Sequence, residues 1–144
     1  MLTRSDLVCW PLAGFATFIF IRYLEFKFGG HPGSVFLFTV LTDWLFLDGL
    51  ERWMRVGVGS MELLAGILLM IRPTQVIGAA LAAGIMSGAI FFHIVSPLGI
   101  DPYHDGGKLF TEACLVLTGA LIILGLRRAE AFALLARIGI QVRV

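Results

Sequence analysis

Four apolar segments dominate the sequence, and each is close to the length that a helix needs to cross a lipid bilayer. They run from about residue 7 to 26, 56 to 71, 74 to 95 and 109 to 126. A spanning helix takes about 20 residues, and the second segment is short because Arg72 and Pro73 end it. With 58% hydrophobic and 15% charged residues, the chain is too apolar for a soluble domain of 144 residues. The sequence therefore predicts an all-α integral membrane protein, a single domain folded as a four-helix bundle.

Two further stretches are predicted to lie at the membrane surface instead of crossing it. Residues 34 to 48 are apolar but carry Asp43 and Asp48, and Trp44 among them suits the level of the lipid headgroups. We therefore expect an extra interfacial helix between the first two spans. The C-terminal stretch 127 to 144 alternates basic and apolar residues at helical spacing, which predicts an amphipathic tail along the membrane surface.

The N-terminal stretch MLTRSDLVCWPLAGF is predicted to be a retained first span. Its apolar run continues past the length of a signal peptide core, without a small-residue cleavage site. Cys9 and Cys114 lie far apart in apolar surroundings and form no CxxC motif, so neither a redox pair nor a zinc site is expected. The net charge of +1 and the scattered basic residues give no case for a nucleic-acid partner.

Four spans place both ends of the chain on the same side of the membrane. That side carries more basic than acidic residues, with Arg72, Arg127 and Arg128 among them, whereas the opposite side is acidic overall. Basic residues are retained on the cytoplasmic side of membrane proteins. We therefore expect both termini in the cytoplasm.

Ionisable residues from all four predicted spans reach the outer half of the membrane in this arrangement. They are Lys27, Glu62, His93, Lys108 and Glu112. An unpaired charge inside a membrane is costly, so such groups usually face the bundle interior and pair with one another. We expect Glu62 to pair with Lys27, and Glu112 with His93, Lys108 or Arg22. These pairs either do no more than hold the bundle together, or they line a pocket that binds a polar headgroup or passes protons.

No metal site is predicted. Asp101, His104 and Asp105 follow His93, but they lie in a loop rich in turn residues, where such side chains usually stabilise turns. His93 has no second intramembrane histidine to complete a bis-histidine haem site. No Ser/His/Asp hydrolase motif is present either.

The order of motifs resembles the DoxX-like family of small four-helix bacterial membrane proteins. A first helix ending in YLEFKF is followed by GSMELLAGILLMI, a small-residue helix ending in a histidine, and HDGGKLFTEACLVLTGALIIL. Lys27 at the end of the first helix, and Gly59 with Glu62 at the start of the second, are the most specific parts. The resemblance implies a four-helix bundle in the plasma (inner) membrane of a bacterium or archaeon, and members are associated with quinol oxidation and other redox complexes.

The sequence and the resemblance together favour a small membrane subunit of a respiratory or redox complex. It is expected to bind a quinone or a similar lipid-soluble molecule at the polar cluster, with no covalently bound cofactor, and to contact the lipid bilayer and other subunits or copies of itself. Any catalytic role would be that of an accessory subunit of a quinone-linked oxidoreductase. The alternatives are a transport or binding protein for a small solute or lipid that works as an oligomer, and a structural assembly subunit without a ligand.

Overall fold

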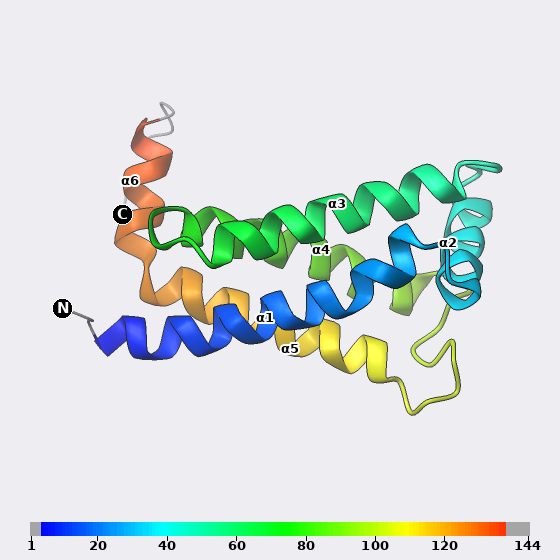
Figure 1. Ribbon diagram of the computed structural model, residues 1–144, viewed down its shortest axis with the longest axis horizontal. Coiled ribbons are helices and arrows are strands. Elements are labelled where there is room, and N and C mark those ends of the chain that lie inside the picture. Colours follow the sequence, from blue (N-terminus) through cyan, green and yellow to red (C-terminus); the bar gives the residue numbers. More distant parts are fainter. Residues whose placement is uncertain (1–3, 138–144) are drawn as a thin grey trace.

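The computed structural model describes residues 4 to 137, and this part of the chain is all-helical, with no β-strand (Figure 1). The prediction of an all-α protein is thus confirmed. The helices are α1 (Arg4–Phe28), α2 (Pro32–Trp44), α3 (Glu51–Leu69), the short 3₁₀ helix η1 (Arg72–Thr74), α4 (Gln75–Val95), α5 (Lys108–Leu126) and α6 (Arg128–Arg137).

Three helical segments in the described part of the chain are long and apolar enough to cross a membrane, which indicates a membrane protein. They are α1, the combined η1 and α4 segment Arg72–Val95, and α5. The fourth long helix, α3, is not among them. It begins at Glu51, five residues before the predicted span, and so includes Glu51, Arg52 and Arg55 in its first turns. A fourth membrane span therefore stays a prediction.

The four long helices pack around one core in the cyclic order α1, α3, α4, α5. Alanines such as Ala13, Ala65 and Ala79 are fully buried in this core, and small residues let helices approach closely. The closest approach lies between the end of α3 and the start of α4. A Cβ on Gly78 would lie 2.6 Å from the backbone nitrogen of Leu69, so only glycine fits there.

From this tight junction α3 and α4 diverge toward the other end of the molecule, where α2 lies across the ends of the long helices (Figure 1). The apolar side of α2 packs on both through Leu37, Phe38 and Leu41, which contact Met54 of α3 and Phe92 of α4 in one cluster. A helix is therefore present where the interfacial helix is predicted, from Pro32 to Trp44, and its place at the membrane surface stays a prediction. We call this the α2 end of the bundle.

At the opposite end, α6 turns away from the direction of α5 and leaves the bundle (Figure 1). It corresponds to the first part of the predicted amphipathic tail, whose residues 138 to 144 lie outside the described residues. The N-terminus of α1 lies at this same end (Figure 1). We call it the α6 end.

Candidate functional site: a polar-lined cavity at the α2 end

A cavity of about 730 Å³ lies where the long helices diverge beneath α2. Its walls come from α1, α2, α3, α4, α5 and the loop after α4, and most of them are apolar. All five residues of the predicted polar cluster line it: Lys27, Glu62, His93, Lys108 and Glu112. A largely apolar pocket of this size with a few convergent polar groups is typical of a site for a small organic ligand.

Lys27 and Glu62 form the ion pair that the sequence predicts. The Lys27 Nζ lies 2.7 Å from Oε2 of Glu62, and both side chains are buried. No other donor in the described residues reaches this oxygen. Gly59, one turn before Glu62, makes the approach possible, because a Cβ there would lie 3.3 Å from the Phe28 ring and 3.4 Å from Lys27 Cβ. The Gly-x-x-Glu spacing thus combines a close contact with α1 and a carboxylate that faces it.

Arg55 supports this pair from α3, a role that the sequence analysis missed. Its guanidinium donates to the backbone carbonyl of Lys27 and to the carboxylate of Glu51. A cation at the carbonyl end of a helix also interacts favourably with the helix dipole. The spacing of Glu51 and Arg55, four residues apart on one helix, was the available signal.

Of the three partners expected for Glu112, only Arg22 forms an ion pair with it among the described residues. Nη1 of Arg22 lies 3.1 Å from Oε1 of Glu112, and the hydroxyl of Tyr23 donates to Oε2 over 2.6 Å. Tyr23 was not among the predicted site residues. The proposed pairings with His93 and Lys108 are wrong: His93 contacts the Gly99 carbonyl instead, and Lys108 forms no ion pair with Glu112.

His93 instead binds the loop that follows its own helix. Its Nδ1 lies 2.6 Å from the carbonyl oxygen of Gly99. A carbonyl oxygen can only accept, so Nδ1 carries the proton and Nε2 of the neutral ring is left as an acceptor. The ring is buried, packs edge-on against Phe110 and lines the cavity.

Lys108 lies at the exposed rim of the cavity. Its backbone N–H donates to Asp105, and its ammonium group has no ion-pair partner among the described residues.

Tyr103 closes the loop onto α2 by donating its hydroxyl to the Gly33 carbonyl over 2.8 Å. Burial and the nearby Asp105 carboxylate raise the pKa of Tyr103 above its usual value.

The loop carboxylates stabilise turns. Asp101 accepts from the backbone N–H groups of Asp105 at 2.9 Å and Gly106 at 3.2 Å. Desolvation opposes ionisation of this side chain, but the backbone N–H groups of Gly107, Asp105 and Gly106 outweigh it and lower the pKa of Asp101. Among the described residues no group of three or more His, Cys, Asp or Glu is placed to hold a metal ion.

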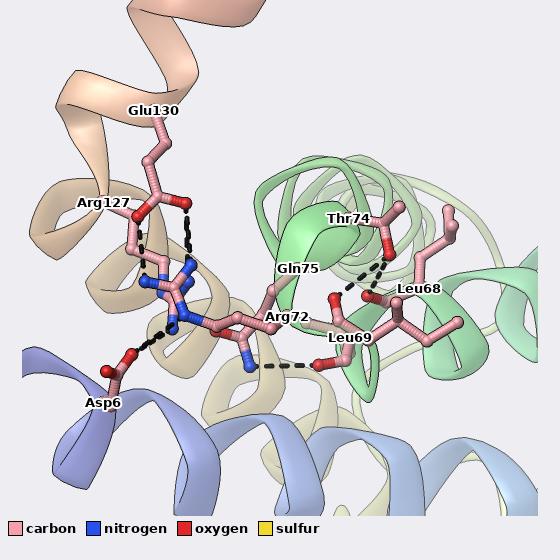
Figure 2. A network of polar contacts seen from close by, with 9 residues as sticks. Asp6, Leu68, Leu69, Arg72, Thr74, Gln75, Arg127 and Glu130 are labelled. Atoms are coloured by element: carbon pink, nitrogen blue, oxygen red, sulfur yellow. Dashed lines mark hydrogen bonds and ion pairs between the residues drawn. The ribbon is translucent and has the colours of Figure 1, made fainter. Parts of the chain in front are cut away.

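A second polar network lies at the α6 end, where the sequence predicts no ion pair. Figure 2 shows Asp6 of α1 and Glu130 of α6 sharing the guanidinium groups of Arg72 and Arg127. Arg127 is 1% exposed and donates to Asp6 over 2.7 Å. Near this network the Gln75 side chain donates to the carbonyl of Leu69 at the end of α3 (Figure 2). The network ties both ends of the chain to the α3–α4 junction.

No protein-family model, curated protein or solved structure matches this chain. The function therefore has to be argued from the geometry of the cavity.

Proposed function

We propose that this protein is a small membrane subunit of a redox complex that binds a quinone, or a similar lipid-soluble molecule, in the cavity at the α2 end. One observation carries the proposal: a cavity of about 730 Å³ has apolar walls and buried polar side chains from α1, α3, α4 and α5. The resemblance to the DoxX-like family agrees with it.

In this proposal α3 is the fourth membrane span. Its first turns, with Glu51, Arg52 and Arg55, lie at the headgroup level beside α2, where charged side chains are tolerated. Glu62 lies deeper and is neutralised by Lys27. Both termini then lie in the cytoplasm of a bacterial or archaeal cell, with the cavity in the outer half of the membrane.

The charges of the cavity favour an uncharged ligand. Each buried carboxylate already has a cation, since Glu62 pairs with Lys27 and Glu112 with Arg22. At the depth of these two pairs, away from Lys108 at the rim, a charged headgroup would have to displace one partner and leave the other unpaired in an apolar site, which is costly. A neutral head with oxygen atoms needs only hydrogen bonds.

The donors and acceptors of the cavity fit a quinone ring. The ammonium of Lys27 has three N–H donors, and its ion pair with Glu62 is a contact to one carboxylate oxygen. It can therefore also donate to a quinone carbonyl. Nε2 of His93 can accept from the hydroxyl of a quinol when the ring is neutral, because Nδ1 donates to the Gly99 carbonyl. The chain holds the ring and exchanges its protons, and the electrons come from a partner subunit.

Mass spectrometry of lipids extracted from the protein, purified in a mild detergent, tests this proposal. A quinone should be retained in near-stoichiometric amount by the wild type. It should be lost in Glu62→Gln, because this variant alters the Lys27–Glu62 pair that lines the cavity. Glu130→Gln at the α6 end is the control and should retain it. A wild-type extract without quinone, from cells that contain it, would contradict the proposal.

A second candidate is a small-solute transporter that works as an oligomer. The observation in its favour is that the cavity reaches the exposed polar residues Tyr103, Asp105 and Lys108 at the bundle end, a path for a water-soluble molecule. Solute flux into proteoliposomes tests it. A purely structural assembly subunit, the third reading, would show neither flux nor a retained lipid.

A further inference from the structure

The cavity has two rims of different chemistry. At the α2 end of the bundle it reaches the exposed polar residues Asp105 and Lys108. On the side it reaches α3 and α4, where the lining residues Met61, Gly84 and Ala80 are exposed and carry no charge. Met61, for example, is 44% exposed. Because these exposed lining residues come from α3 and α4, the second rim is an opening between these two helices, which diverge toward the α2 end in Figure 1.

Small residues keep this lateral opening clear. A Cβ added to Gly84 or Gly88 would meet no atom within 4 Å, although both residues lie in the middle of a tightly packed bundle helix and line the cavity. A glycine in a helix interior is destabilising relative to alanine. Nothing in the local packing requires glycine at either position, in contrast to Gly78.

We infer that the ligand has a long apolar tail, which leaves the cavity between α3 and α4 and lies in the bilayer over Gly84 and Gly88. The inference rests on the proposed function and adds the substrate class: a molecule with a neutral, oxygen-bearing ring and a hydrocarbon tail. Its ring lies deeper, beside the buried groups Glu62, His93 and Glu112.

The two rims are unequal routes for such a tail. At the bundle end the tail would cover Asp105 and Lys108, and charged groups lose their hydration when apolar atoms cover them. At the side it meets Met61, Leu81 and bare helix backbone, which are already next to lipid when α3 and α4 span the membrane. The lateral route therefore costs no desolvation of charge, and the chain need not enclose the whole molecule.

The test compares two probes in lipid nanodiscs: a benzoquinone with a decyl tail, and the same ring with a methyl group instead. Gly88→Leu places a side chain in the lateral opening. Gly125→Leu is the matched control, because Gly125 is an exposed helical glycine of α5 that does not line the cavity and whose Cβ would also meet nothing. Both changes raise helix propensity, so both variants should fold.

We expect Gly88→Leu to weaken binding of the tailed quinone about tenfold, since the side chain displaces several methylene contacts of the tail. Binding of the methyl compound should be unchanged, and Gly125→Leu should bind both probes as the wild type does. If Gly88→Leu binds the tailed probe normally, or weakens both probes equally, the lateral route is overturned while the quinone site stands. If the wild type binds neither probe, the proposed function falls and the inference with it.

Discussion

The Nζ atom of Lys27, at the end of α1, lies 2.7 Å from Oε2 of Glu62, one turn after Gly59 on α3. Each side chain neutralises the other at a position where neither has another charged partner among the described residues. The pair explains how a carboxylate can lie within the apolar stretch GSMELLAGILLMI. It also fixes the wall of the cavity from which a ligand would receive its hydrogen bond.

Removing one charge of this pair should destabilise the protein strongly. Glu62→Gln leaves the buried Lys27 ammonium without its counter-charge, and breaking a buried pair from one side costs about 3–5 kcal/mol. Thermal unfolding in detergent, followed by circular dichroism, measures the loss. The double variant Lys27→Met with Glu62→Met should recover much of it, because no unpaired charge remains. An unchanged melting curve for Glu62→Gln would show that the pair does not contribute to stability.

Tyr23→Phe isolates the hydrogen bond to Glu112. The hydroxyl donates to Oε2 over 2.6 Å, and a hydrogen bond to a charged group contributes about 1.5–3 kcal/mol. We expect a loss of stability within this range, with the fold retained because Arg22 still pairs with Glu112. In the background Glu112→Gln the same change should cost less. Equal losses in both backgrounds would mean that the two side chains are not coupled.

His93→Ala should weaken retention of the proposed quinone without unfolding the bundle. The imidazole contacts its own loop through Gly99 and contributes no ion pair, so its removal affects the cavity more than the core. Lipid retained per protein, measured by mass spectrometry, should fall while the helical circular dichroism spectrum stays the same. His104→Asn is the control, since His104 is exposed, does not line the cavity and has a positive φ that asparagine tolerates. Full retention in His93→Ala would exclude His93 from the site.

The network at the α6 end should respond unequally to its two acids. Asp6 is buried against Arg127, so Asp6→Asn should cost about 3–5 kcal/mol. Glu130 is 43% exposed, and Glu130→Gln should cost at most about 1 kcal/mol. Thermal unfolding compares the two. Hydrogen exchange should also quicken in α6 for Glu130→Gln, because that carboxylate is the ionic link from α6 to Arg72. Equal losses would contradict the burial argument.

Acid should loosen the loop after α4. The pKa of Asp101 is lowered in the folded protein, so its ionised form stabilises the loop. This stabilisation is complete above the usual carboxyl pKa of 3.8 and is lost as the pH falls through the lower folded value. The protection of the Asp105 and Gly106 amides from hydrogen exchange, relative to the intrinsic rate at each pH and measured from pH 6 downward, should therefore fall only below pH 3.8. Asp101→Asn should show fast exchange at every pH.

The sequence by itself determined the helices, because length, apolar composition and breakers such as Pro73 act locally along the chain. It also predicted that the polar cluster Lys27, Glu62, His93, Lys108 and Glu112 lies at one end of the bundle. Consecutive long helices run in opposite directions, so the end of one helix lies at the same level as the start of the next. The Lys27–Glu62 pair followed from this reasoning, and Gly59 marks it in the sequence.

Only the tertiary structure decided the partners and the shape of the space between them. Arg22 and Tyr23, not His93 or Lys108, reach Glu112, because the rotation of α1 about its axis and the fold of the loop over His93 depend on packing between distant segments. The same holds for Asp6 and Arg127, which come from opposite ends of the chain. The divergence of α3 and α4 accompanies the contact at Gly78 at one end and the packing of α2 on both helices at the other, and neither contact has a local signal in the sequence.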